Sequence, residues 1–235
     1  MNIKQVAEQV LVALEELSTE ERKEKTRYFA PTARRVVGVS NPDMRLVIKE
    51  LKKEYSHWSS RDWISLSKEL VKMSVFECQV VAYELIAGSR KLLDALEYGD
   101  LEALQRNLDN WASVDHFTVG IYGVLWGKGV VKDGHIDRLL ESENVWDRRV
   151  GVVSTVALNT ASRGGTGDTG RTLSVCERVV HERHPMIRKA LSWALRSLIR
   201  WDREAVYGFL ETHRGSMSAQ VVREVSHKLE YGTKN

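Results

Sequence analysis

The chain of 235 residues is poor in the residues that break helices or cross-link a fold. It has only 3 prolines and 2 cysteines, Cys78 and Cys176, which lie far apart in segments with helical spacing. Two such cysteines exclude a disulfide framework and a C-x-x-C metal or redox motif, so we expect buried, reduced thiols. The scarcity of proline, together with many Leu, Arg, Lys, Glu and Val residues, favours helices.

Long apolar runs are also missing. No run approaches the roughly 18 residues that a membrane span needs, and Met1–Gln5 is amphipathic, without the apolar core of a signal peptide. We therefore expect a cytoplasmic protein. A net charge of +3 and a pI of about 8.8 are only mildly basic, so the distribution of charge matters more than its total.

Apolar residues recur at intervals of three and four along most of the chain, as in Ile3, Val6, Val10 and Leu14. The spacing predicts helices at about residues 3–17, 20–29, 44–55, 59–73, 75–88, 90–106, 113–127, 131–141, 145–160, 171–183, 185–200, 202–213 and 218–229. Short links favour antiparallel neighbours, and helix pairs every roughly 35 to 45 residues suggest HEAT-like repeats. We expect one all-α domain over residues 1–235, a curved solenoid with a concave binding face.

One glycine-rich segment interrupts this pattern. Gly165–Gly170 matches G-x-G-x-x-G, and Val152–Ala157 before it could pass for a strand, as in a dinucleotide fingerprint. However, no second β-α unit follows, and residues 146–157 keep helical spacing. The other interpretation is a loop between two helices, whose small residues and flanking Arg163 and Arg171 could approach a phosphate backbone closely.

Basic residues are concentrated between positions 171 and 203. Eight Arg or Lys residues stand there against three acidic ones, which is typical either of a solvated face or of a groove for phosphates. Trp193 and Arg196 share a helix face within this run. Tryptophans at helical spacing are more often core residues, and we assign Trp126, Trp146 and Trp201 to the core. His181 and His184 have no clear third ligand, so we expect no metal site.

Trp111 and Asp115 are four residues apart and would share one face of a helix. A flat aromatic ring beside a carboxylate suits a cationic ligand, because both attract positive charge. The alternative is purely structural, with Trp111 in the core and Asp115 or Ser113 as a helix cap.

Four short motifs together resemble one family. Trp111–Asp115 resembles the W-x-S-V-D motif of the AlkD family, the alkylpurine DNA glycosylases built from HEAT-like repeats. Arg27–Tyr28 resembles its Arg-Tyr pair, Asn144–Arg149 its N-[IV]-W-x-x-R, and Arg188–Arg196 its K-A-[IL]-x-W-x-L-R helix. These motifs occur in the same order and cover about residues 20 to 200.

The resemblance implies a C-shaped stack that holds duplex DNA on its concave face. It implies an aromatic cleft formed by Tyr28, Trp111 and Trp193, with Asp115 as the catalytic carboxylate. Arg149 would contact the DNA backbone near the lesion. The remaining candidate DNA-binding residues are Arg27, Arg148, Arg163, Arg171, Lys189 and Arg196.

The implied activity is hydrolysis of the N-glycosidic bond of cationic N3- or N7-alkylated purines in duplex DNA. The resemblance implies no cofactor and no metal. Because it implies no catalytic lysine, we expect a monofunctional enzyme that leaves an abasic site. We also expect the enzyme to be a monomer and to act without flipping the base. It would be associated with the nucleoid when acting on DNA. Two alternatives remain: a non-catalytic HEAT-repeat DNA-binding scaffold and a protein-interaction solenoid.

The chain departs from the family pattern at two places. Asn110-Trp111-Ala112 stands where the family often has Trp-Trp-Asp, and residues 164–170 are glycine-rich where a lysine-bearing segment is expected. The first change keeps the tryptophan of the cleft. The second puts the backbone contacts at that loop in doubt.

Overall fold

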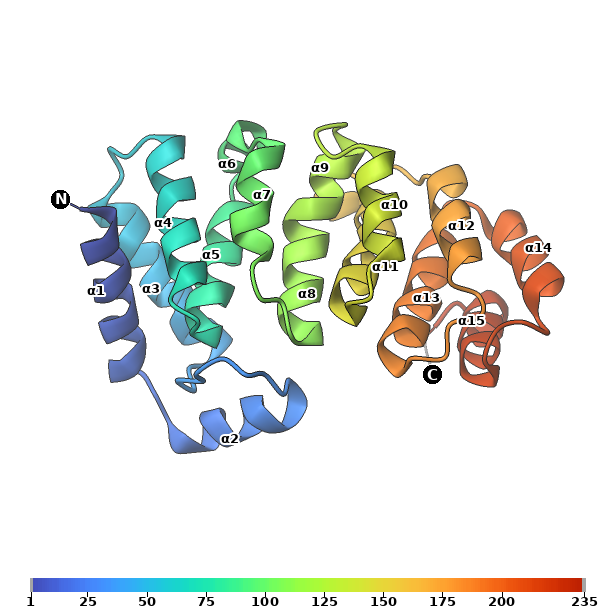
Figure 1. The fold of residues 1–235 in the computed structure, drawn as a ribbon, viewed down its shortest axis with the longest axis horizontal. Helices are drawn as coiled ribbons and strands as arrows, with labels where there is room; N and C mark the ends of the chain where they lie inside the picture. The colour runs from blue at the N-terminus through green and yellow to red at the C-terminus, as the bar shows by residue number, and fades with distance from the viewer. Residues whose placement is uncertain (1, 234–235) are drawn as a thin grey trace. The chain divides into compact units, whose positions relative to one another are not determined.

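The computed structural model describes residues 2–233, which fold into α-helices joined by short links (Figure 1). Within these residues no strand forms, and one isolated β-bridge pairs Arg35 with Val75. The predicted all-α fold is thus confirmed. The contacts group the chain into two compact units, Met1–Ile121 and Tyr122–Asn235. A single domain over residues 1–235 and an overall curvature stay predictions.

The first unit consists of two layers of helices and one helix outside them. Its helices are α1 (Ile3–Glu16), α2 (Glu20–Phe29), α3 (Asn41–Glu54), α4 (Ser60–Lys72), α5 (Phe76–Ala87), α6 (Arg90–Ala95), α7 (Tyr98–Gln105) and α8 (Trp111–Phe117). In one layer α4 packs between α1 and α7, and in the other α5 packs between α3 and α8. Contacts of α4 with α5 and of α1 with α3 join the layers, as in HEAT-like helix pairs.

The second unit repeats this arrangement. Its helices are α9 (Gly123–Gly127), α10 (Asp133–Glu141), α11 (Val145–Leu158), α12 (Thr169–Arg178), α13 (Pro185–Leu198), α14 (Arg203–His213) and α15 (Ala219–Tyr231). Here α11, α13 and α15 pack in sequence as one layer, and each contacts the helix that precedes it in the chain. Both units are therefore built from stacked helix pairs.

Short polar side chains fix where most helices begin. Each accepts a hydrogen bond from a backbone N–H of the first turn, which would otherwise lack a partner inside the helix. The side chains that cap helices in this way are those of Asn2, Thr19, Ser40, Ser59, Ser89, Asn110, Asn144, Asp168, His184, Asp202 and Ser218.

Two predicted helices are interrupted in the structure. The prediction of a single helix at 90–106 is wrong. Leu96 is extended (φ −74°, ψ 137°) and ends α6, and Glu97 is the N-cap of α7. The helix expected at 113–127 begins at Trp111 and contains a π-helical turn, η1 (Thr118–Tyr122), before α9. Such π-turns are frequent at functional sites.

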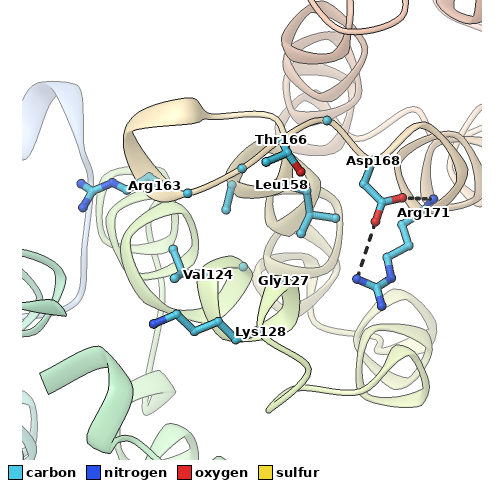
Figure 2. Close-up of a pocket in the computed structure, with 13 residues that line it drawn as sticks. Val124, Gly127, Lys128, Leu158, Arg163, Thr166, Asp168 and Arg171 are labelled. Carbon is cyan, nitrogen blue, oxygen red and sulfur yellow. Dashed lines mark hydrogen bonds and ion pairs between the residues drawn. The ribbon is translucent and has the colours of Figure 1, made fainter. Parts of the chain in front are cut away.

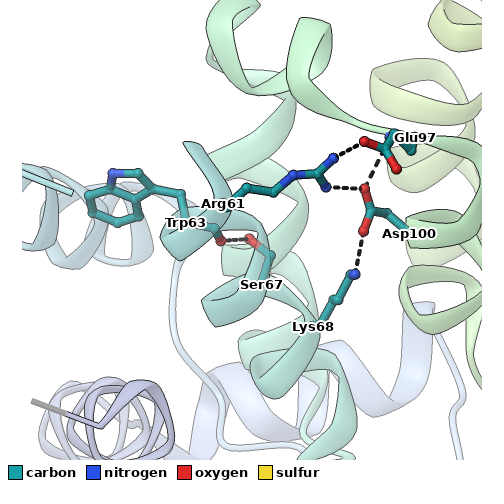
Figure 3. A network of polar contacts seen from close by, with 6 residues as sticks. All are labelled: Arg61, Trp63, Ser67, Lys68, Glu97 and Asp100. Carbon is teal, nitrogen blue, oxygen red and sulfur yellow. Dashed lines mark hydrogen bonds and ion pairs between the residues drawn. The ribbon is translucent and has the colours of Figure 1, made fainter. Parts of the chain in front are cut away.

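A polar network joins α4 to the start of α7 (Figure 3). Asp100 is 7% exposed and accepts hydrogen bonds from Arg61 and Lys68 and from the backbone N–H of Glu97. Burial raises the pKa of Asp100, but these three bonds outweigh it and hold the pKa below its ordinary value. The ionised carboxylate therefore stabilises the folded state.

The substitution Asp100→Asn should lower the free energy of unfolding at neutral pH by about 1.5–3 kcal/mol, the range for hydrogen bonds to charged groups. Because the folded pKa is depressed, this stabilisation is present above the ordinary pKa of aspartate and is lost as the pH falls through the lowered value. Denaturant titrations of both proteins at decreasing pH should therefore converge. Asp94→Asn, at a 54% exposed side chain on α6, is the control and should change stability little. A constant difference down to low pH would contradict the role of Asp100.

The two cysteines are buried, free thiols. Both Cys78 and Cys176 are buried and form no disulfide, as predicted. Desolvation raises the pKa of Cys78 to about 12 and raises that of Cys176 as well, so neither thiol ionises near neutral pH. None of the helices in residues 2–233 is both long and apolar enough to cross a membrane.

Candidate active site

Trp111 and Asp115 lie one turn apart on α8, the arrangement that their spacing predicts. Asn110 begins the helix: its side chain accepts a hydrogen bond from the N–H of Ser113 at 3.0 Å and is almost fully buried. Trp111 is 40% exposed and Asp115 is half-buried. The structural alternative for Trp111, a core position, is therefore wrong, and neither Asp115 nor Ser113 is the cap.

Trp111 also holds the end of α2. Its indole Nε1–H donates a hydrogen bond to the backbone carbonyl of Phe29, at 2.7 Å. Tyr28, the preceding residue, is 79% exposed and its ring meets that of Phe29 edge-to-face, with 5.0 Å between centroids. The bond thus places two of the three predicted cleft aromatics, Tyr28 and Trp111, on segments that are joined to each other.

Two further side chains fasten the same connection. Asp109 accepts hydrogen bonds from the Thr32 hydroxyl at 2.7 Å and from the backbone N–H of Ala33 at 2.6 Å. Arg34 is 7% exposed and donates to the carbonyls of Arg106 and Val71. Burial lowers the pKa of Arg34, while Tyr83 and Asp109 act in the opposite direction. These anchors of the segment before α8 were not predicted from the sequence.

This fastening matters because α2 has no buried residue of its own. Figure 1 shows α2 outside the layers formed by the other helices of its unit. The chain that follows it packs through Ala30 and Val36, which form a small core with Phe76 of α5 and with Ala112 of α8. Ala112 therefore has a packing role at the position where the family often has aspartate.

The substitution Trp111→Phe tests the anchoring role of the indole N–H. It keeps an aromatic ring but removes the donor to Phe29, so we expect the free energy of unfolding to fall by about 1 kcal/mol. Trp201→Phe is a matched control, because Trp201 is 39% exposed and its Nε1–H donates to the carbonyl of Asn159 at 2.8 Å. Denaturant titrations of both variants and of the wild type make the comparison. An unchanged free energy of unfolding for Trp111→Phe would show that the bond to Phe29 does not hold the end of α2.

Trp193, the third predicted aromatic, belongs to the second unit, where it is half-buried on α13. Its expected pairing with Trp111 stays a prediction. On the same helix Lys189 is exposed, as a DNA contact requires. Arg196 is mostly buried: its Nε donates to Ser192 at 3.1 Å and its guanidinium lies 3.9 Å from Glu224. Burial lowers the pKa of Arg196, and Glu224 partly offsets this shift.

The two arginines of α11 are also engaged within the protein. Arg149 is only 4% exposed and its Nη1 donates to the carbonyl of Met186, at the start of α13. Arg148 donates to the carbonyl of Ser142 at 2.8 Å and pairs with Glu182 at 3.1 Å. These interactions favour a structural role for both arginines over the contact with the DNA backbone that the resemblance implies. In the first unit, by contrast, Arg27 is exposed at the end of α2.

The glycine-rich segment is a loop that covers the end of α11, and the dinucleotide alternative is wrong because residues 152–157 are helical. A Cβ at Gly165 would lie 2.4 Å from the carbonyl oxygen of Ala157, and one at Gly167, where φ is +85°, would lie 2.7 Å from the ring of Trp201. These close contacts explain both glycines without a ligand. They also correct the assignment of Trp201 to the core, since it covers this loop at the surface.

Arg163 and Arg171 flank this loop. Arg163 is half-buried. Arg171 pairs with Asp133 at 3.3 Å and with Asp168 at 3.6 Å, and its guanidinium lies over the ring of Trp126. Trp126 is buried as predicted, and Trp146 is half-buried. Within the described residues no group of three or more His, Cys, Asp or Glu side chains is placed to hold a metal ion.

Comparison with known proteins agrees with this fold. Residues 10–229 match the family model described as DNA alkylation repair enzyme. Among solved structures, the chain is similar to a predicted DNA alkylation repair enzyme from Enterococcus faecalis, with a TM-score of 0.71 and 17% identity over 91% of this chain and 97% of that one. None of the curated proteins compared with the chain matches it. The chain therefore belongs to the family of DNA alkylation repair enzymes.

Proposed function

We propose that the protein is a monofunctional DNA glycosylase that removes cationic N3- and N7-alkylated purines from duplex DNA. The observation that supports this most is the pair on α8, an exposed Trp111 one turn from a half-buried Asp115. A non-catalytic member of the family would not need an aromatic ring and a carboxylate together at an accessible helix end.

The chemistry of alkylated purines needs these two residue types. Alkylation of a ring nitrogen makes the base cationic and a good leaving group, and the glycosidic bond breaks with oxocarbenium character at the sugar. A fixed carboxylate stabilises that positive charge, and Asp115 would also orient the attacking water. The water adds to the sugar, the base leaves and an abasic site remains. No lysine nucleophile is involved.

The aromatic side chains would bind the cationic base and the sugar through their ring faces. Each contact contributes ~1–2 kcal/mol when it is desolvated. Tyr28 and Trp111 supply two rings from joined segments, and we propose Trp193 as the third. An exposed Tyr28 suits a lesion approached from the backbone while it stays in the stack, so we propose excision without base flipping.

Some of the side chains predicted to contact DNA are exposed, and others are bonded to groups within the protein. Arg27 and Lys189 are exposed and can reach phosphates. Arg148, Arg149 and Arg196 are engaged with groups of the protein itself, so we leave them out of the proposed interface.

The test is release of 7-methylguanine and 3-methyladenine from methylated duplex DNA under single-turnover conditions. We expect both bases to be released and abasic sites to form, with no strand cleavage by the enzyme itself. Duplex binding without base release would instead identify a DNA-binding scaffold, and an absence of salt-dependent duplex binding would identify a protein-interaction solenoid.

A further inference from the structure

Arg188, near the start of α13, is not among the DNA contacts predicted from the sequence. It directly precedes Lys189 and is half-buried. Its Nε atom is shielded from solvent and has no hydrogen-bond partner. Within residues 2–233 the guanidinium forms no hydrogen bond and no ion pair. Arg188 therefore carries a positive charge that is partly removed from water and that no group of the described chain neutralises.

Two other arginines of the second unit show the usual arrangement. Arg149, which is buried, donates to the carbonyl of Met186. Figure 2 shows Arg171, which is half-buried, ion-paired with Asp168. Such pairing is the rule because an unpaired charge that is removed from water costs free energy. The lack of a partner for Arg188 therefore points to a partner outside the chain.

Two carboxylates of the neighbouring segments are bonded to other groups. Glu224 of α15, a helix that packs against α13, accepts a hydrogen bond from the Ser192 hydroxyl at 2.5 Å. Glu182, in the link before α13, lies 3.1 Å from Arg148. No ion pair joins either carboxylate to Arg188, so the positive charge of Arg188 stays available to a ligand.

The position of Arg188 in α13 is also unfavourable for a cation. The helix begins at Pro185 after the N-cap His184, so Arg188 lies at the end of the first turn. The N-terminus of a helix carries a partial positive charge, which repels a cation and attracts an anion. The charge of Arg188 is therefore unfavourable in the free protein and becomes favourable once an anion binds beside it.

We propose that Arg188 binds a phosphate of the DNA backbone, so that α13 presents two adjacent cations, Arg188 and Lys189, to the duplex. The exposed Lys189 shows that this part of the helix surface is open to solvent. A guanidinium suits a phosphate because its parallel N–H donors match two of the oxygens. The inference rests on the proposed function only in requiring that the protein binds duplex DNA. It replaces Arg149, the contact implied by the resemblance, with an arginine that has no partner in the protein.

The test is the variant Arg188→Gln, with an undamaged duplex titrated over a range of salt concentrations and a denaturant titration in parallel. We expect binding to weaken roughly tenfold and the salt slope to fall by about 0.9, the value for one phosphate contact. The denaturation midpoint should stay the same or rise, because the variant loses no bond within the protein.

Two control variants separate charge from position. Arg188→Lys keeps the charge and should keep the salt slope. Arg200→Gln removes the same charge beyond the C-terminal end of α13, where Arg200 is exposed and lies over the ring of Trp201, and it should leave the slope nearly unchanged. A folded Arg188→Gln protein with the wild-type salt slope would overturn the proposal. A lower midpoint with unchanged affinity would also overturn it, since that result identifies a structural arginine.

The same titrations keep this inference distinct from the glycosylase activity, because undamaged DNA needs no excision. A wild-type protein that binds the duplex but releases no alkylated base would contradict the proposed function, and the comparison of Arg188→Gln with its controls would still decide the role of Arg188. A wild-type protein without salt-dependent affinity for the duplex would overturn both.

Discussion

Replacing Asp115 by Asn is expected to slow the release of 7-methylguanine from methylated duplex roughly 10²–10³-fold, the loss typical of one removed electrostatic group in an active site. The amide has the same shape as the carboxylate but no charge to stabilise an oxocarbenium-like sugar. Duplex affinity should change little, because the proposed phosphate contacts, Arg27 and Lys189, lie on other side chains. Single-turnover rates and binding isotherms measured on the same duplex separate these two quantities.

Asp94→Asn is the matched control for this substitution, since Asp94 lies in the same unit with a side chain that is 54% exposed. It should release the base at the wild-type rate. Because Asp115 is half-buried and has polar neighbours, a denaturation curve should accompany the assay. A folded Asp115→Asn protein with an undiminished rate would remove Asp115 from the mechanism.

Local patterns in the sequence predict most of the helices. Apolar spacing gives the approximate positions and the buried faces of most helices, and capping residues such as Ser40 and Ser59 give their starts. The break at Leu96 was missed because apolar residues keep helical spacing on both sides of it. The π-turn at Thr118–Tyr122 was missed for a similar reason, because one extra residue per turn leaves nearly the same pattern in so short a segment.

For the candidate site, sequence reasoning succeeds where the determinants are local. The shared face of Trp111 and Asp115 follows from their spacing alone. The bonds of Asp109 to Thr32 and of Arg34 to Arg106 join positions more than 70 residues apart, so no local pattern reveals them. The spacing of arginines likewise does not show which ones are buried. Arg149 is the clearest example.

Arg149 leads to the second large expected effect. The resemblance implies a DNA contact, but the side chain is 4% exposed and donates to the carbonyl of Met186 between α11 and α13. Arg149→Met keeps much of the volume and removes the charged donor. We expect the free energy of unfolding to fall by about 2–4 kcal/mol, because the carbonyl of Met186 loses its partner and the two helices lose a charged link made by a buried arginine.

For Lys189→Met we expect the opposite pattern, an effect on DNA binding and almost none on stability. Lys189 is exposed on α13, so its loss should leave stability almost unchanged and reduce the salt slope of duplex binding by about 1. Arg149→Met should leave that slope unchanged at a temperature where the variant is folded. If Arg149→Met instead lowers the slope and keeps full stability, then Arg149 leaves its bond to Met186 to bind a phosphate, and the interface proposed here must include it.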